Sequence, residues 1–359
     1  MKKSLLALAV LGAFAGAASA QSSVTLFGIV DLNARYVKTG DAKVKSLSTD
    51  GINSSRLGFR GVEDLGGGLK AGFHLEAGIS PDTGSTSANN QLFNRRSTVS
   101  LMGSFGEVRL GRDYTPTFWN LTVFDPFGTN GLGSSTNLTT SGGITTPLLS
   151  GAGTHTRANN TIGYFLPSGI GGIYGQAMIA AGEGTNGNKY AGGRIGYAAG
   201  PIDVAAAYGQ TEVLDSPTRK FKMFDIGASY DLGVAKLMAQ YVNMKTEQIL
   251  GVAADASQRN WLLGAVVPMG QGEIHASYVQ AKGKDDAEGL KARQFALGYV
   301  YNLSKRTAVY GTVADLKNEG GSSFVVGTPP NVSAETLTTA SSAADKKSRG
   351  FEVGLRHSF

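Results

Sequence analysis

Cysteine is absent from the 359-residue chain, proline is sparse at 10 residues, and no apolar run beyond the N-terminal segment reaches transmembrane-helix length. The lack of cysteine excludes disulfides, thiol catalysis and thiolate metal sites. The lack of a run of about 20 apolar residues excludes a spanning helix in the rest of the chain. Lysine and arginine are scattered, so nothing indicates an arm that binds nucleic acid.

Common catalytic and nucleotide-binding motifs are also missing. None of the four histidines belongs to an H-E-x-x-H or G-x-S-x-G context, no Gly-Lys-Ser/Thr triplet completes a P-loop, and no spacing resembles a zinc or EF-hand site. His74 and Glu76 lie two residues apart and could touch on one strand face. A pair of that kind is more often a hydrogen bond on a wall than a catalytic dyad. We therefore expect no enzyme and no cofactor.

The N-terminal 20 residues have the three regions of a secretory signal. Lys2 and Lys3 form a basic start, an apolar stretch runs from Leu5 to Ala18, and Ala18-Ser-Ala20 fits a cleavage site. A spanning helix is disfavoured, because the apolar stretch is too short and no stop-transfer charges follow. Removal of residues 1–20 would leave 21–359 as one domain and lower the net charge from +6 to about +4.

The C-terminal residues alternate between an apolar and a wet face. Odd positions from Phe351 to Phe359 are apolar or aromatic apart from His357, whereas the even positions are polar or glycine. A period of two is the signature of a β-strand with two different faces. The chain stops on this strand with an aromatic residue, which is typical of a membrane barrel that must close.

Comparable segments recur along the whole chain after the signal. In the clearest, Leu69 to Ile79, apolar residues share one face while Lys70, His74 and Glu76 share the other. Glycine, with 51 residues, supplies the positive φ angles that tight hairpins need. The pattern predicts a chain built mainly of amphipathic strands.

The connections between these strands are of two kinds that take turns. Short glycine turns such as Leu65–Gly68 alternate with long polar stretches such as Lys38–Asn53. Short periplasmic turns and long extracellular loops are the pattern of outer-membrane barrels. Counting the intervening strands predicts an all-β transmembrane antiparallel barrel of 16 strands, which needs roughly 160 residues at about 10 residues per strand.

The distribution of charge separates this prediction from a soluble β-sandwich, whose strands also alternate. Arg56, Arg60, Lys70, Glu76 and Asp225 fall on the face opposite the apolar one. Buried charges cost several kcal/mol unless they are paired, so a solid core would not accept this set. A water-filled lumen and a lipid-facing exterior remove the difficulty.

The longest connection, about 113–156, opens with a series of aromatic residues and prolines. Pro116, Phe118, Trp119, Phe124 and Phe127 make it too apolar for a loop immersed in water. Loops of this length in compact domains are usually functional or disordered. We expect it to fold into the lumen and narrow the pore; the alternative is an extracellular contact patch.

Several motifs together resemble the trimeric general porins of proteobacterial outer membranes. They are Arg56-Leu-Gly-Phe-Arg-Gly-Val-Glu-Asp-Leu-Gly-Gly-Gly-Leu-Lys-Ala, Arg95-Arg-Ser-Thr-Val-Ser-Leu, Phe105-Gly-Glu-Val-Arg-Leu-Gly-Arg, Asp125-Pro-Phe-Gly, Arg157-Ala-Asn-Asn and the terminal Phe359. The resemblance covers the mature chain and implies a 16-stranded barrel, a homotrimer, an infolded third loop and passive diffusion of ions and small hydrophilic solutes.

The resemblance also implies a constriction with an arginine side and an acidic side. The basic candidates are Arg56, Arg95, Arg96 and Arg157, and the acidic candidates are Glu76, Asp113 and Asp125. Further lumen-lining candidates are Arg60, Lys70, His74 and Arg109. The motif favours Arg95 as the inward residue and simple alternation favours Arg96; a β-bulge would reconcile the two. The alternative role of each arginine is a salt bridge on the wall or an interface contact.

The inner-face candidates are mainly basic, and rings of arginine favour anions. We therefore expect a weakly anion-selective diffusion channel in the bacterial outer membrane, with outer-membrane lipid and lipopolysaccharide around it. The competing hypothesis is a structural or adhesive barrel with a plugged lumen.

Overall fold

The computed structural model describes residues 23–87, 91–139, 154–184, 189–212, 220–247, 256–327 and 343–359. The strands are β1 (Ser23–Thr39), β2 (Ala42–Thr49), β3 (Arg56–Gly66), β4 (Leu69–Ser80), β5 (Ser85–Thr86), β6 (Arg96–Gly103), β7 (Gly106–Tyr114), β8 (Arg157–Phe165), β9 (Ile173–Ala180), β10 (Tyr190–Ala199), β11 (Ile202–Glu212), β12 (Lys220–Asp231), β13 (Lys236–Glu247), β14 (Ala256–Met269), β15 (Gly272–Asp285), β16 (Lys291–Asn302), β17 (Thr307–Glu319) and β18 (Lys347–Ser358). A helix, α2 (Pro116–Val123), and a 3-10 turn, η1 (Ser135–Leu138), lie between β7 and β8. In the described part of the chain, no helix is long and apolar enough to cross a membrane. The predicted signal peptide, residues 1–20, lies outside the described residues.

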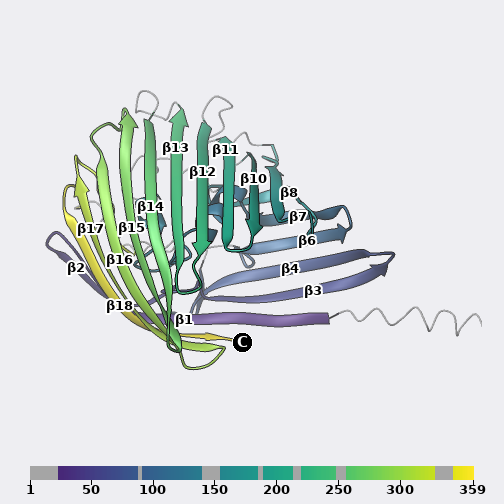
Figure 1. Ribbon diagram of the computed structural model, residues 1–359, viewed down its shortest axis with the longest axis horizontal. Helices are drawn as coiled ribbons and strands as arrows, with labels where there is room; N and C mark the ends of the chain where they lie inside the picture. Colours follow the sequence, from purple (N-terminus) through teal and green to yellow (C-terminus); the bar gives the residue numbers. More distant parts are fainter. Residues whose placement is uncertain are drawn as a thin grey trace, which may run out of the picture.

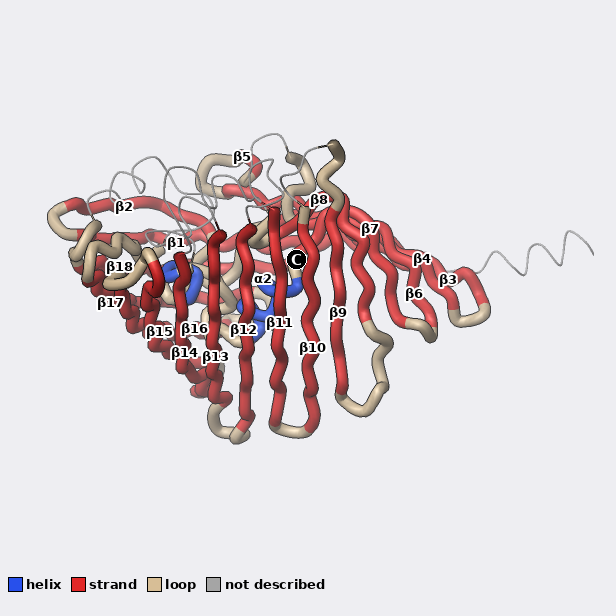
Figure 2. The backbone as a smooth tube through the Cα atoms, turned by 90° about the horizontal axis from the view of Figure 1, so that it is seen from above, coloured by secondary structure: helices blue, strands red, loops and turns tan. Residues whose placement is uncertain are grey.

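The strands form one closed antiparallel sheet (Figures 1 and 2). Among the described residues, sixteen strands follow one another around the barrel, and the short β2 and β5 are additions to it. Each barrel strand pairs with its neighbours in the chain, and β1 closes the ring by pairing with β18 from Ile29 opposite Ser358 to Thr39 opposite Ser348. The predicted all-β, 16-stranded barrel is confirmed.

The two ends of the described chain meet at the closure. The amide of Gly28 donates to the carbonyl of Phe359 at 3.1 Å, and the amide of Phe359 donates back to Gly28 at 3.0 Å. The Phe359 ring covers Gly28 so closely that a Cβ at that glycine would lie 2.3 Å from the ring Cζ. The terminal strand therefore closes the barrel, as its alternation and aromatic end predict.

The first long connection differs from the prediction. The sequence predicts a loop over Lys38–Asn53, but β1 continues to Thr39. Strand β2 folds back along the C-terminal half of β1, where Leu32 lies opposite Thr49. The N-terminal part of β1, Ser23–Ile29, pairs instead with β3. The segment is polar on both faces yet alternates, so its composition resembles a loop while its period is that of a strand.

Side chains alternate between an exposed outer face and a covered inner face. On β14, Trp261 and Leu263 are 57% and 63% exposed, whereas the alternate residues Asn260 and Leu262 are 3% and 2% exposed. An inward leucine that is this well buried cannot face open water. Part of the lumen must therefore be filled by the protein itself.

The segment after β7, residues 115–156, is here called loop 3, and its described parts lie inside the barrel. Thr115 caps α2 by accepting from the amide of Phe118, and Pro116 takes the first helical position, where its missing N–H costs nothing. Leu121 and Phe124 are completely buried against the wall. Phe124 lies over Gly227 of β12, where a Cβ would approach the ring to 2.2 Å. The infolded third loop is thus confirmed.

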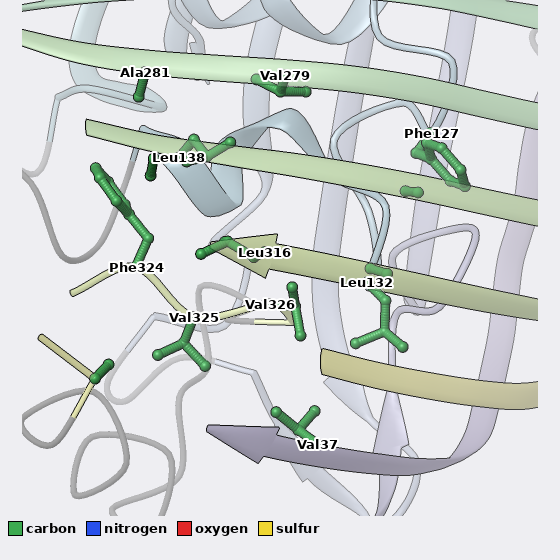
Figure 3. Packing of buried hydrophobic residues seen from close by; sticks show 14 of the residues in the cluster. Val37, Phe127, Leu132, Leu138, Val279, Ala281, Leu316, Phe324, Val325 and Val326 are labelled. Carbon is green, nitrogen blue, oxygen red and sulfur yellow. The ribbon is translucent and has the colours of Figure 1, made fainter. Parts of the chain in front are cut away.

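A second apolar cluster fills the lumen beside β15, β16 and β17. Figure 3 shows Leu132 and Leu138 of loop 3 in the same cluster as Phe324, Val325 and Val326 from the segment after β17. These side chains are at most 1% exposed. Two infolded segments therefore occupy one side of the barrel, and the remaining open space lies between loop 3 and the opposite wall.

Candidate functional site

A cavity of about 920 Å³ remains between loop 3 and the wall. Its charged lining residues are Arg35, Arg56, Arg95, Arg157, Arg356, Asp50, Asp125 and Glu273. Five guanidinium groups thus face three carboxyl groups. Because arginine stays protonated at any relevant pH, this surplus of positive charge is permanent.

Two of the predicted basic residues converge on Tyr114, the last residue of β7. Arg95 donates through Nη2 to the Tyr114 hydroxyl at 2.8 Å, and Arg157 donates to the same oxygen through its own Nη2. The guanidinium carbon of Arg157 lies 4.1 Å from the centre of the Tyr114 ring, a cation–π arrangement. Tyr114 was not singled out from the sequence, although it follows Asp113 directly at the start of the predicted loop.

Glu76 on β4 is the carboxylate at the centre of this cluster. Its Oε1 lies 2.5 Å from Arg95 Nε and 3.5 Å from Arg56 Nη1, and its Oε2 lies 3.1 Å from His74 Nε2. The predicted contact of His74 with Glu76 is confirmed. Glu76 therefore holds the arginines in place on the same side of the cavity rather than facing them from across it.

The register settles how Arg95 and Arg96 are both placed inside. Arg96 lies opposite Glu76 in the ladder of β4 and β6, so it points inward as simple alternation predicts. Arg95 comes just before β6 begins and reaches Glu76 from the loop. The described pairing of β4 with β6 is regular, so the bulge that would have reconciled the two predictions is not needed there.

Asp113 belongs to a separate cluster lower on the wall. Its Oδ2 lies 2.5 Å from Arg109 Nη1 and 3.7 Å from Arg96 Nε, and Arg109 also binds Glu107 at 2.9 Å. Arg109 further lies 3.9 Å from the centre of the Phe165 ring. Asp113 is only 4% exposed and is not part of the cavity lining.

Asp125 in loop 3 does line the cavity, but its carboxylate is occupied by the loop. It accepts from the amides of Phe127 at 2.8 Å, Thr129 at 3.2 Å and Ser135 at 2.8 Å. Burial, which leaves the residue 3% exposed, raises the pKa of the Asp125 carboxyl. Its main effect in this arrangement is to fix the turn of loop 3 after α2.

The remaining predicted residues lie on the inner face toward the short turns. Arg60 lies 5.1 Å from the centre of the Phe27 ring, and His74 packs edge-on against the same ring at 5.3 Å. Lys70 is near the turn end of β4, opposite Asp64 on β3. These positions surround the approach to the cavity from that end, and none of the three lines the cavity.

Two arginines that line the cavity were not among the candidates. Arg35 on β1 donates through Nε to Glu352 at 2.8 Å and through Nη1 to the carbonyl of Gly327 at 3.2 Å. Arg356 on β18 donates to Asn53 at 3.2 Å. Both lie on the polar face of an alternating strand, so the period of two was the signal that could have identified them.

Comparison with known proteins gives four results. The profile of a family described as Gram-negative porin matches residues 7–321. The chain is 42% identical over 373 residues to outer membrane porin protein 32 of Delftia acidovorans, with the whole of both chains covered. The solved anion-selective porin from Comamonas acidovorans is 38% identical, with a TM-score of 0.79 and coverage of 94% of this chain and 100% of that chain. The trimer form of the outer membrane protein OmpT of Vibrio cholerae is similar in fold alone, at 14% identity and a TM-score of 0.67 over 94% of this chain and 99% of that chain.

Proposed function

The chain belongs to the Gram-negative porin family, and we propose that its channel favours anions through the arginines beside Tyr114. As a porin, the protein lies in the outer membrane and forms a water-filled channel for passive diffusion of ions and small hydrophilic solutes. The observation that carries the selectivity is the convergence of Arg56, Arg95 and Arg157 at the cavity, with Glu76 as the carboxylate partner of Arg56 and Arg95.

Electrostatics explains why this arrangement would favour anions. A narrow aqueous passage through a wall of low dielectric constant focuses the field of fixed charges. The carboxylates of Glu76 and Asp125 are held by arginines and by loop amides, so they offset less of that field than free carboxylates would. The solved porin that is 38% identical carries anion selectivity in its title. The preference should be modest, because ions of both signs are small compared with the cavity.

We propose that the partners are two further copies of the chain together with outer-membrane lipid and lipopolysaccharide. The trimer form of the Vibrio protein supports a threefold assembly for this fold. On the outer faces of β3 to β7, exposed apolar side chains predominate, and they offer an interface between copies: Phe59, Phe73, Val99, Leu101 and Leu110. The family and fold favour a channel over an enzyme, and the competing hypothesis of an adhesive barrel with a plugged lumen is less favoured because the cavity remains open beside loop 3.

The test is single-channel recording of the purified mature protein in a planar bilayer, with the reversal potential measured under a salt gradient. Steps in groups of three with a reversal potential that favours anions would support the proposal. Strong cation selectivity at neutral pH would contradict the role of the arginines. A silent bilayer from properly folded protein would instead favour the plugged barrel.

A further inference from the structure

The indole of Trp119 points from α2 into the lumen, away from the barrel wall. Thr117 and Leu121 lie on the wall side of this helix, where they are 2% and 0% exposed. Because successive residues of an α-helix are about 100° apart around its axis, Trp119 points about 180° away from the direction midway between Thr117 and Leu121. Trp119 is 40% exposed and lines the cavity. The one other tryptophan of the sequence, Trp261, lies on the outer face of β14.

The other phenyl and phenol rings that line the cavity are already covered or buried. The Tyr114 ring is stacked on Phe118 at 5.4 Å, and the Arg157 guanidinium carbon lies 4.1 Å from its centre. Phe127 is 7% exposed. Within the described part of the chain, Trp119 has a single ring contact, a tilted one with Tyr114 at 5.9 Å and 41°. The indole is therefore an apolar surface held in water, and a solute that covers it lowers the free energy.

Two guanidinium groups of the same cavity have unused hydrogen-bond donors. Arg157 donates through Nη2 to the Tyr114 hydroxyl. Arg56 donates through Nε to the carbonyl of Ser54 at 2.9 Å and through Nη1 to Glu76 at 3.5 Å. Among the described residues, Arg157 Nη1 and Arg56 Nη2 have no hydrogen-bond partner. A carboxylate, which only accepts hydrogen bonds and has two oxygens, is the group that suits two such donors.

The exposed indole and the arginines together define the chemistry of the solute. An indole alone would also attract a cation to its face, but the five guanidinium groups of the cavity repel cations. An anion without a ring reaches the arginines and leaves the indole uncovered. An aromatic carboxylate meets both requirements, because arginine also stacks on aromatic rings, as Arg157 does on Tyr114. The Tyr114 ring contacts both Trp119 and Arg157, so one small solute can reach both.

We propose that Trp119 makes the channel prefer aromatic carboxylates among the anions that it passes, with the ring of the solute on the indole and its carboxylate on Arg56 and Arg157. The preference rests on the proposed function, because the arginines that favour anions also hold the carboxylate. Contact between two aromatic rings contributes roughly two- to tenfold in affinity. Binding of that strength raises the concentration of the solute in the channel and is still weak enough to release it.

The experiment compares benzoate with cyclohexanecarboxylate, which has the same charge and nearly the same size but a saturated ring. Each acid is added to the channel in a planar bilayer with KCl, and the concentration that halves the single-channel current is measured. For the native channel, this concentration should be roughly two- to tenfold lower for benzoate than for cyclohexanecarboxylate. Benzylammonium, which has a ring and a positive charge, should reduce the current less than benzoate does.

Substitutions at the two tryptophans assign the difference to one ring. Trp119→Ala should make the half-blocking concentrations of the two acids equal, and Trp119→Phe should keep part of the difference. Trp261→Ala is the matched control, because it removes the tryptophan on the outer face; it should distinguish the two acids as the native channel does.

A second measurement needs no substitution in α2. Trp261→Phe leaves Trp119 as the only tryptophan of the chain, so its fluorescence reports a solute at this indole. In folded protein in detergent, 4-nitrobenzoate, which quenches indole emission on contact, should quench with saturation. Adding Arg56→Gln and Arg157→Gln should raise the half-saturating concentration severalfold.

Three outcomes would overturn the proposal: equal half-blocking concentrations of the two acids in the native channel, a difference that persists in Trp119→Ala, or quenching that does not saturate. The reversal potential in KCl alone keeps the two hypotheses separate. A native channel that prefers chloride but does not distinguish the two acids contradicts the role of Trp119 and leaves the proposed function intact. A native channel that prefers potassium contradicts the proposed function itself.

Discussion

Asn120 in loop 3 and Asp225 on the barrel wall form a buried hydrogen bond. The Asn120 amide donates to Asp225 Oδ1 at 2.5 Å, and both residues are 0% exposed. The Asn120 side-chain oxygen accepts from Arg194 Nε at 2.7 Å, and its main-chain carbonyl accepts from Gln240 at 3.3 Å. One asparagine thus ties α2 to β10, β12 and β13, which fixes how far loop 3 extends into the lumen.

The variant Asn120→Ala should loosen loop 3. It leaves the Asp225 carboxylate and the Arg194 guanidinium without their shared partner, at a cost of about 1–3 kcal/mol for a buried group that loses its hydrogen bond. We expect a lower midpoint of thermal unfolding in detergent and noisier single-channel currents. A matched control is Asn243→Ala, since Asn243 lies on the outer face of β13.

Adding Asp225→Asn to Asn120→Ala should restore part of the lost stability, because the second change removes the buried carboxyl that has lost its partner. A double variant that is less stable than the sum of the two single effects would contradict this account of the anchor.

The arginines beside Tyr114 should set the selectivity. Replacing Arg157 by Gln removes one fixed charge from the cavity, and we expect the ratio of anion to cation permeability to fall by roughly twofold or more. Reversal potentials under a salt gradient measure the ratio. Arg157→Lys is the control, because it keeps the charge while losing the stacking on the Tyr114 ring. If the Arg157→Gln and native channels had the same ratio of anion to cation permeability, Arg157 would have no role in the selectivity.

Deletion of Thr117–Phe127 should widen the channel. This segment contains all of α2 except Pro116, together with Phe124, and both occupy lumen space that water would enter. Single-channel conductance should rise, while stability falls because Met223 and Met244 lose the cover of Leu121. A deletion variant that folds with unchanged conductance would mean that the segment does not limit the flow of ions.

His155 should make stability depend on pH. Burial between Phe118 and Phe221 lowers the pKa of His155 to about 4, from a usual value of 6.5. Between about pH 4 and pH 6.5, His155 is therefore protonated in the unfolded chain and neutral in the folded chain. The contribution is fully present above pH 6.5 and falls by about 1.4 kcal/mol per pH unit down to pH 4. Urea unfolding in detergent at pH 7 and pH 4.5 should show this loss, and His155→Phe should reduce it. If the stability of His155→Phe depended on pH as that of the native chain does, a group other than His155 would cause the loss.

The strands were predictable because a barrel between lipid and water imposes the same period of two on all of them. Leu69–Ile79 and Phe351–Phe359 show this period without help from distant residues. The hairpin of β1 with β2 escaped prediction because its strand carries polar residues on both faces. The polar composition of this segment favoured a loop, although its alternation with a period of two correctly indicated a strand.

The arrangement of the candidate site was less accessible from the sequence. Arg95 precedes β6 and reaches the lumen from the loop, so alternation along the strand identifies only Arg96 as an inward residue. Asp125 was expected as an acidic charge of the constriction, but its acceptors are used by the amides of its own loop, a local pattern that alternation does not encode. Arg35 was visible as an inward polar residue, yet its proximity to the cavity depends on Glu352, 317 positions away in sequence.

The contact between Gly28 and Phe359 should control closure of the barrel. A Cβ at Gly28 would lie 2.3 Å from Phe359 Cζ and 2.8 Å from the carbonyl oxygen of Arg56, so Gly28→Ala must displace the ring or part the strands. We expect slower folding into detergent micelles and a smaller folded fraction, measured by the heat-dependent mobility of the barrel on gels. Because the ring is the nearer obstacle, Phe359→Ala should partly rescue Gly28→Ala, although Phe359→Ala alone should also fold less well through the loss of the aromatic cover. A double variant that folds worse than either single variant would show that the ring is not the obstacle, and that the backbone of β3 sets the limit at this position.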